Sequence, residues 1–417
     1  MPIPAADQAV LDAVEARAES LVSRAVAWSN LNSGSRNGAG LMAVLDALEI
    51  EARRLPGMVE RVATAPIVTV ADDGRVVEEP TAPALRITTR PEAEIQVILT
   101  GHYDTVFPAD SPFQTVVSRP DGALNGPGLA DMKGGISVML GALEAFEAHA
   151  DKDRVGWTVL LSPDEEIGSP ASAPLLAELG ACGHLGLTYE PALPDGSLAG
   201  ERKGSANFHL AVHGLAAHAG RAFEEGRNAV AGAAILASRL HALNGQRQGV
   251  TVNVAKISGG AALNVVADHA VVRFNCRVPD TQAAAWIDAS VREIAAAPPF
   301  EGLTTHLHGG FTRPPKPMDA AQTRLAQAVA DAGEALGQPI RFAPSGGVCE
   351  GNNLHAAGLP NIDTLGVVGG AIHSDQEFAW PASFADRAKL SALILCRIAS
   401  GQIDARALKA LRMETMG

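Results

Sequence analysis

Short uninterrupted apolar runs alternate along the chain with longer runs in which apolar residues recur every three or four positions. The short runs have the length of strands buried in a parallel sheet, and they lie at residues 95–99, 157–161, 185–189 and 362–367. The longer runs have the spacing of helices with one apolar face, and they cover residues 6–29, 41–55, 134–149 and 173–179. Strands that alternate with helices predict an α/β domain with a mostly parallel sheet.

The segment from residue 203 to 312 follows a different order. Its pattern predicts strands and helices in the order β-α-β-β-α-β, at residues 206–212, 228–243, 249–257, 265–278, 281–296 and 303–308. This order is that of the split, ferredoxin-like unit, whose ends lie close together and can interrupt another domain. We therefore predict an α/β domain made of residues 1–202 and 313–417, with a ferredoxin-like domain of residues 203–312 inserted in it.

Composition and charge narrow the class of protein. The 417 residues are 47% apolar and 19% charged, which is typical of a globular chain with two cores. The formal net charge of −13 argues against nucleic acid or an anionic membrane as a partner. The four cysteines form no Cys-x-x-Cys pair, and no signal peptide or membrane span is evident. These features favour a cytoplasmic protein with reduced thiols.

Each of the four apolar strands runs into side chains that can bind a metal. These side chains are His102 and Asp104 after the first strand, Asp164, Glu165 and Glu166 after the second, Glu190 after the third, and His373 in the loop after the fourth. Asp131 joins them from the glycine-rich turn GPGLADMKGG. Any one of them alone could cap a helix or a turn. Together, beyond the carboxyl ends of parallel strands, they predict a metal site, and the lack of thiolates favours a catalytic zinc site.

Several motifs also carry a resemblance to a known family. They are Gly-His-Tyr-Asp-Thr-Val at 101–106, Gly-Leu-Ala-Asp-Met-Lys-Gly-Gly at 128–135, Pro-Asp-Glu-Glu-Ile-Gly-Ser at 163–169, Glu-Pro at 190–191, Ala-His-Ala-Gly at 217–220 and Ile-His-Ser-Asp at 372–375. In this order they resemble the dizinc carboxypeptidase and aminoacylase superfamily of metallopeptidases, and most closely its bacterial glutamate carboxypeptidases. The early Asn-Ser-Gly-Ser turn at 32–35 also resembles that subgroup.

The resemblance implies a role for each candidate metal-site residue. Two Zn²⁺ ions per chain would be bridged by Asp131, with Co²⁺ or Mn²⁺ as substitutes that also suit nitrogen and oxygen ligands. His102 and Glu190 would complete one zinc site, and Glu166 and His373 the other. Glu165 would be the general base. Asp104, two residues after His102, would accept the second imidazole N–H and fix the tautomer of that ligand.

The resemblance also implies that the inserted domain is a lid through which two chains form a homodimer. His218 would reach the partner's site and polarise the scissile carbonyl, although a surface histidine in a turn is an equal alternative from the sequence. Asn264 and Arg277 would grip a substrate carboxylate, and the Gly346-Gly347 turn would let the backbone approach the substrate. Arg313, in Thr-Arg-Pro-Pro, is a weaker candidate for the same grip, and for it we expect an exposed loop arginine.

One segment departs from the family pattern. Relatives commonly have Gly-Gly followed by Thr or Ser and Asp, whereas this chain has Cys349 and Glu350 after Gly346-Gly347-Val348. The change weakens any transfer of glutamate specificity to this chain. A nucleophilic Cys349 is not expected, because no activating base lies at a recognised spacing.

These inferences predict a metal-dependent hydrolase that cuts an amide bond next to a free carboxylate. Its substrate would be a small peptide or an N-acyl amino acid. An aminoacylase or deacylase of the same fold is the first alternative. The second alternative, a metal-free dimeric binding protein, is disfavoured because every expected ligand and Glu165 are present.

Overall fold

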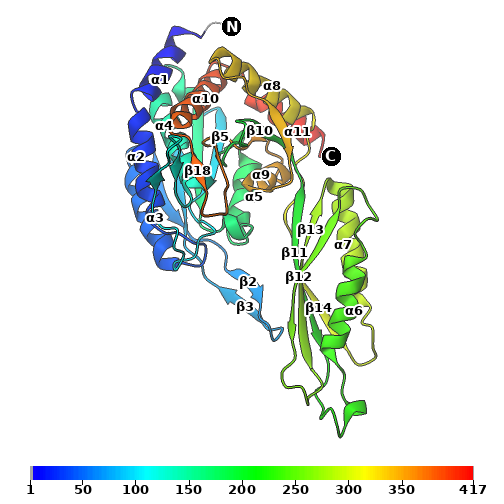
Figure 1. Cartoon of the computed structure of the whole chain (residues 1–417). Helices are drawn as coiled ribbons and strands as arrows, with labels where there is room; N and C mark the ends of the chain where they lie inside the picture. Colours follow the sequence, from blue (N-terminus) through cyan, green and yellow to red (C-terminus); the bar gives the residue numbers. More distant parts are fainter. Residues whose placement is uncertain (1–2, 417) are drawn as a thin grey trace.

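The computed structural model describes residues 3–416, which form two bodies with separate cores (Figure 1). The larger core takes its residues from Val10 to Leu198 and from Leu325 to Leu408, and the smaller core takes its residues from Ala206 to Leu303. An α/β domain is therefore interrupted by an inserted unit, as the sequence predicts. The boundaries at 202/203 and 312/313 stay a prediction.

The larger body is built on a six-stranded mixed sheet. In spatial order its strands are β1 (Met58–Val62), β4 (Ala84–Thr89), β8 (Val155–Ser162), β5 (Ile95–His102), β9 (Leu185–Thr188) and β16 (Asn361–Ile362). The strands β8, β5, β9 and β16 run parallel, while β1 and β4 form an antiparallel edge. Because β8, β5 and β9 are parallel, their carboxyl ends meet at one edge of the sheet, where side chains for a site can gather.

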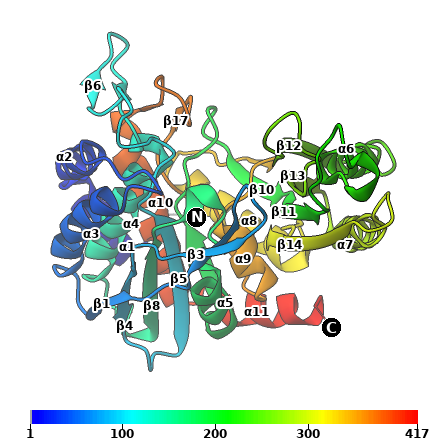
Figure 2. The same ribbon diagram turned by 90° about the horizontal axis from the view of Figure 1, so that it is seen from below.

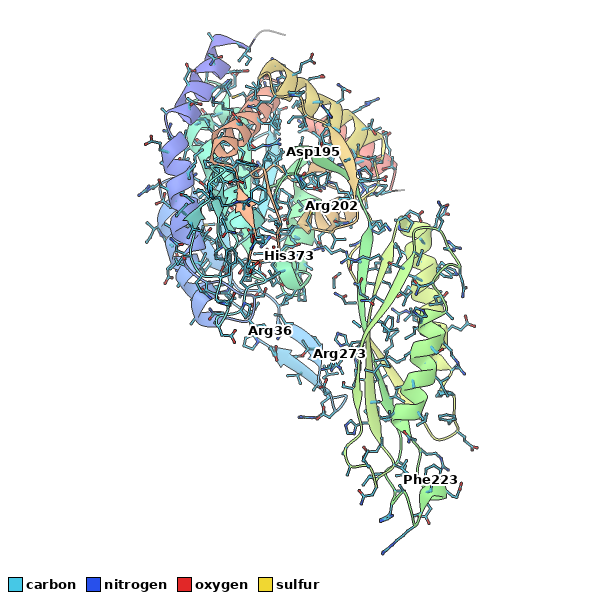
Figure 3. The ribbon with its side chains drawn as sticks, in the orientation of Figure 1. Arg36, Asp195, Arg202, Phe223, Arg273 and His373 are labelled. Atoms are coloured by element: carbon cyan, nitrogen blue, oxygen red, sulfur yellow. The ribbon has the colours of Figure 1, made fainter. Side chains whose placement is uncertain are left out.

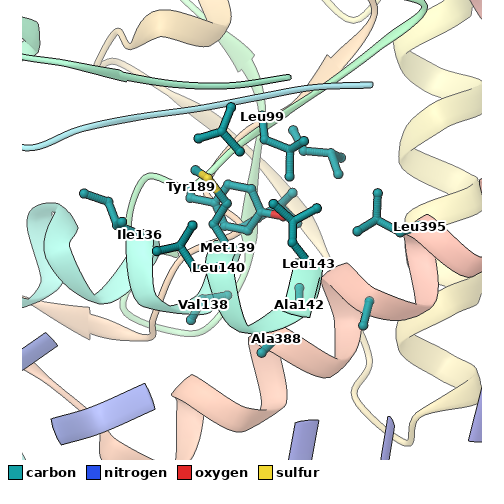
Figure 4. Close-up of a cluster of buried hydrophobic side chains, with 14 of the residues drawn as sticks. Leu99, Ile136, Val138, Met139, Leu140, Ala142, Leu143, Tyr189, Ala388 and Leu395 are labelled. Carbon is teal, nitrogen blue, oxygen red and sulfur yellow. The ribbon is translucent and has the colours of Figure 1, made fainter. Parts of the chain in front are cut away.

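Helices cover both faces of this sheet. One side holds α1 (Ala5–Glu15), α2 (Ala18–Ser29), α4 (Gly134–Phe146) and α10 (Pro381–Ala399), and the opposite face is covered by α5 (Ala173–Cys182) and α9 (Glu350–Ala356). Figure 4 shows how α4 and α10 pack beneath the sheet, with Met139 and Leu143 of α4 close to Leu99 and Tyr189. Nearly all of α4 is buried because it lies between the sheet and other helices. The remaining helices of this body are α3 (Gly38–Ala52), α8 (Ala320–Ala335) and α11 (Ala405–Glu414).

Two elements differ from the sequence predictions. The helical pattern of residues 6–29 is divided at Ala16 and Arg17, because α1 lies mainly against α10 while α2 lies mainly against α4. The apolar run 362–367 pairs with β9 only at Asn361 and Ile362. Beyond them the chain leaves the ladder: Asp363 binds Arg202 and Lys316, and the Thr364 hydroxyl accepts the N–H of Ala199.

The inserted unit has the predicted β-α-β-β-α-β order. Its antiparallel sheet has the spatial order β12 (Thr251–Gly259), β13 (His269–Val278), β11 (Gly204–His213) and β14 (Thr304–Arg313), and its helices are α6 (Ala229–His241) and α7 (Thr281–Ala296). Alternate residues of β11 such as Phe208 and Leu210 are buried in the core that the two helices share with the sheet. The alternate face carries His209 and His213, because successive side chains of a strand point to opposite faces.

A hairpin of the larger body reaches across to the open face of the inserted sheet (Figure 1). It consists of β2 (Ile67–Val70) and β3 (Val76–Glu79). Asp72 in its turn pairs with Arg273 at 2.7 Å and with Lys256 at 3.1 Å, and Val70 packs against the inserted sheet. These contacts join the hairpin of the larger body to the inserted sheet.

Several smaller elements complete the fold (Figure 2). A parallel pair joins β10 (Leu198–Arg202) to β15 (Phe342–Ser345), and a second small sheet joins β17 (Gly369–Gly370), β18 (Phe378–Ala379), β7 (Leu124–Asn125) and β6 (Val117–Ser118). The short helical turns are η1 (Leu129–Lys133), η2 (Lys152–Arg154), η3 (Glu165–Ile167) and η4 (Phe223–Glu225). Across residues 3–416, no helix combines the length and the apolar character needed to span a bilayer.

Candidate active site

The five predicted metal ligands meet beyond the carboxyl ends of β5, β8 and β9. They form two groups, His102–Asp131–Glu190 and Asp131–Glu166–His373, and within each group the potential ligand atoms lie within 4.8 Å of one another. Asp131 belongs to both groups: its Oδ1 lies 3.1 Å from His102 Nε2, and its Oδ2 lies 3.2 Å from His373 Nε2. Two neighbouring ligand sets that share one carboxylate can hold a pair of metal ions.

The turn that carries Asp131 is held in place by the side chain of Glu377. The buried Glu377 carboxylate accepts N–H groups from Gly128 at 3.1 Å, Ala130 at 2.9 Å and Asp131 at 3.0 Å. Gly128 adopts a φ of +66°, where a side chain would be strained. Glu377 is not among the residues predicted from the sequence. Its position four residues after His373 was the only signal that could have pointed to it.

Asp104 contacts residues of both ligand groups: His102 in the first group, and the turn that carries Glu166 in the second. One of its carboxylate oxygens lies 3.2 Å from His102 Nδ1. The same carboxylate accepts the backbone N–H of Glu165 at 3.1 Å, the N–H of Glu166 at 3.2 Å and the hydroxyl of Ser35 at 2.7 Å. One buried anion therefore orients a ligand imidazole and also fixes the turn that presents Glu165 and Glu166. The Asn-Ser-Gly-Ser turn contributes Ser35 to this arrangement.

The buried carboxylates of the site need positive charges beside them to remain ionised. Burial raises the pKa of Glu166 well above its usual range and that of Glu190 to about 7, because desolvation disfavours a carboxylate. Hydrogen bonds to Asp131 and Glu166 raise the pKa of His373 to about 11. Within the described chain, the buried Glu190 Oε1 has no hydrogen-bond partner. Three carboxylates, two imidazoles and no thiolate make a donor set that fits a catalytic zinc pair.

Glu165 lies beside the ligand groups and contacts Arg313. Its Oε1 accepts a hydrogen bond from Arg313 Nη2 at 2.5 Å. The expectation of an exposed loop arginine at position 313 is wrong, since this side chain is 0% exposed. The reason is tertiary: β14 continues to Arg313, and its end is covered by α9 and the Glu165 turn.

A cleft of about 670 Å³ opens next to the ligands. Its walls include Asp131, Glu166, Glu190 and His373 on the metal side, and Glu165, Arg202, Arg277, Arg313 and Gly347 elsewhere. Figure 3 shows His373 and Arg202 on the side of the larger body that faces the inserted unit. The buried Arg277 Nη1 finds no hydrogen-bond partner among residues 3–416. A carboxylate in the cleft could therefore pair with Arg277.

His218 and Asn264 do not line this cleft. They lie near each other on neighbouring loops of the inserted unit, where His218 bridges to Val265 and the Ala219 N–H donates to the Asn264 carbonyl at 2.9 Å. His218 is exposed there. Phe223, which follows closely in the chain, marks this distant end in Figure 3. Gly346 is also outside the lining of the cleft, although its neighbour Gly347 belongs to it.

Cys349 and Glu350, the two residues that differ from the family pattern, are not among the residues that line the cleft. Cys349 caps the start of α9, and burial raises the pKa of its thiol, so it is no nucleophile. The Glu350 carboxylate contacts the Ser162 hydroxyl, and burial raises the pKa of Glu350 to about 8.

A third cluster, Asp7–His149–Cys396, has the residue types of a metal site but a different explanation. His149 Nδ1 accepts the N–H of Asp151 at 3.1 Å, so the ring proton sits on Nε2, which lies 3.1 Å from Asp7 Oδ1. A protonated Nε2 cannot bind a metal. The Asp7–His149 hydrogen bond joins α1 to the turn that follows α4.

Comparisons with known proteins agree with this geometry. The profile of Peptidase family M20/M25/M40 matches residues 98–397. Carboxypeptidase G2 of Pseudomonas sp. (strain RS-16) is 26% identical over 385 residues, which cover 89% of this chain and 88% of that protein. Succinyl-diaminopimelate desuccinylase of Xylella fastidiosa (strain M12) is 26% identical over 316 residues, which cover 67% of this chain and 78% of that protein.

A protein of known structure has the same fold. An M20 family metallo-carboxypeptidase from Sulfolobus solfataricus superposes with a TM-score of 0.68 at 15% identity, covering 90% of this chain and 98% of its own. The family profile spans well over half of the chain, and it includes all five candidate ligand positions. The resemblance drawn from the sequence motifs is thus confirmed, and the chain belongs to Peptidase family M20/M25/M40 as a metal-dependent hydrolase.

Proposed function

We propose that this protein is a two-metal amidohydrolase that releases an amino acid with a free carboxylate from a small peptide or an N-acyl amino acid. The observation that carries the proposal is the pair of ligand groups that share Asp131 on the wall of the 670 Å³ cleft. The carboxypeptidase name of one relative supports the choice of bond.

The metals would be two zinc ions. His102, Asp131 and Glu190 would hold one ion, and Asp131, Glu166 and His373 the other. Such a pair, when bound, polarises a carbonyl and lowers the pKa of a water molecule. Cobalt or manganese could take the same nitrogen and oxygen ligands.

Side chains and backbone of the chain would transfer the proton, orient a metal ligand and bind the substrate. Glu165 would accept a proton from the attacking water and give it to the departing amine nitrogen as the C–N bond breaks. Asp104 would hold the His102 imidazole in its ligand tautomer. Arg277 would bind the substrate carboxylate with its planar guanidinium, and the Gly346-Gly347 turn would approach the substrate with its backbone.

A deacylase of the same fold is the second candidate, because a desuccinylase is among the relatives. A panel of N-acyl amino acids and dipeptides, each with its C-terminal amide analogue, separates the two. We expect the zinc-loaded protein to cleave only substrates with a free carboxylate. Preference for one acyl group across many amino acids would favour the deacylase, and no hydrolysis of any substrate would contradict the proposal and favour a binding protein.

We further propose that residues 203–312 form a lid through which two chains make a homodimer with shared sites. β12 is an edge strand of the lid sheet, and Leu263 and Val265 are exposed beside Asn264. Edge strands and exposed apolar side chains are typical of such interfaces. His218 and Asn264, remote from their own cleft, would then serve the partner's site.

Mixing two inactive variants tests the shared site. A Glu165→Ala chain and a His218→Ala chain should each be nearly inactive as pure dimers. In a mixed dimer the His218→Ala chain keeps its own Glu165 and takes His218 from its partner, so one complete site forms. Random exchange of equal amounts should restore roughly a quarter of wild-type activity. No recovery after confirmed subunit exchange would contradict the shared site and leave the metal assignment standing.

A further inference from the structure

Arg313 is a buried arginine at the junction of the two bodies. It is the last residue of β14, where the chain leaves the inserted unit and returns to the larger body. Its side chain is 0% exposed. An arginine keeps its charge at all ordinary pH values, so a buried guanidinium must be paired.

The guanidinium is held at two points. Nη1 donates to Asn353 Oδ1 at 2.7 Å, while Nη2 donates to Glu165 Oε1 at 2.5 Å and to the Glu165 carbonyl at 3.2 Å. Asn353 is itself fixed, because its Nδ2 donates to the Thr312 carbonyl at 2.9 Å. The planar fork of an arginine suits such a two-point contact, which a lysine could not reproduce.

These contacts leave one oxygen of Glu165 available. Its backbone N–H binds Asp104, and its Oε1 is occupied by Arg313. No residue of the described chain forms a hydrogen bond with Oε2, although Glu165 lines the cleft. The carboxylate therefore has one oxygen held by Arg313 and the other free of hydrogen bonds, in a residue that lines the cleft.

The pairing differs from that of Arg277. Arg277 lies in the same cleft with Nη1 unpaired, as a receptor for a substrate carboxylate would. Both terminal nitrogens of Arg313 are already bound to protein groups, and only its Nε, on the inner side of the fork, finds no partner among residues 3–416. The geometry favours a role toward Glu165 over a role toward the substrate.

We propose that Arg313 is a positioning residue for Glu165. It holds Oε1 so that Oε2 is the oxygen that takes the proton, and because it ends β14 it links the orientation of the base to that of the lid. This inference rests on the proposed function of Glu165 as the base.

Chemical rescue tests the proposal. Arg313→Ala should lower kcat by about 100-fold, the loss expected when a reacting group is misplaced by about 1 Å, with KM within about twofold of wild type. Because the buried Arg313 adjoins the cleft, the space that its side chain vacates should open to the cleft and admit added guanidinium ions. We expect them to restore kcat in a saturable manner in this variant and to leave the wild type unchanged.

Two further variants sharpen the result. Arg90→Ala is the matched control, since Arg90 forms a two-point pair with Glu147 far from the cleft, and we expect normal kcat and no response to guanidinium. Arg313→Lys covers the case in which the alanine variant fails to fold. It keeps the buried charge but loses the fork, so kcat should fall at least tenfold with KM unchanged.

Two outcomes would overturn the proposal. The first is a folded, metal-loaded Arg313 variant with wild-type kcat. The second is a raised KM with unchanged kcat, which would make Arg313 a substrate receptor. A wild-type enzyme that cleaves nothing in the substrate panel would instead mark the failure of the proposed function itself.

Discussion

Glu165→Gln should lower kcat by on the order of 10²-fold to 10⁴-fold, the usual contribution of a general base. Glutamine has nearly the same shape, and its amide oxygen can still accept the hydrogen bond of Arg313, so the fold and the metal content should not change. What is lost is the ability to accept a proton. Steady-state kinetics on the best substrate of the panel, with metal content measured on the same sample, gives the result.

The neighbouring residue supplies the control. Glu166 lies in the ligand group with Asp131 and His373, and its Oε2 is 3.1 Å from His373 Nε2. Glu166→Gln should therefore weaken metal binding, and excess zinc should restore part of the activity. If Glu165→Gln loses metal while Glu166→Gln keeps it, the assignment of base and ligand is reversed.

Metal removal should abolish activity and lower the melting temperature. The native site places three carboxylates close together, and burial of two of them already raises the pKa values of Glu166 and Glu190. Ions that bind only the folded state stabilise it, so a chelator should lower Tm and added zinc should restore both Tm and turnover. Titration of the demetallated chain should reach two zinc ions, and full activity without metal would contradict the mechanism.

The zinc count has its own control. Cys396→Ala alters the third histidine-containing cluster, in which the proton on His149 Nε2 excludes a metal. This variant should bind as many zinc ions as the wild type. A drop by one ion would show that the cluster is a metal site and that the tautomer assigned to His149 is wrong.

The sequence by itself determined the class of fold and brought the candidate metal ligands to one edge of the sheet. Apolar runs that end in His102, in Glu165 and Glu166, and in Glu190 are local patterns, and parallel strands bring their carboxyl ends to one edge whatever the details of packing. The order of strands and helices in the inserted unit could also be predicted, because strand alternation and helical spacing are visible within each element. His373 was predicted from its Ile-His-Ser-Asp motif. The strand predicted before it could not locate it, because only Asn361 and Ile362 pair with β9 and the rest of that run is a loop.

Only the tertiary structure decided the contacts that join distant segments. Glu377 supports Asp131 from 246 residues further along the chain, and Arg313 reaches Glu165 across 148 residues. The sequence does not show that either side chain is buried, because a buried carboxylate or guanidinium has the same letter as an exposed one. The break at Ala16 and Arg17 and the docking of the 67–79 hairpin on the inserted sheet also depend on what each segment packs against. Local periodicity records which face of an element is buried, but the identity of the neighbour is settled only when the chain has folded.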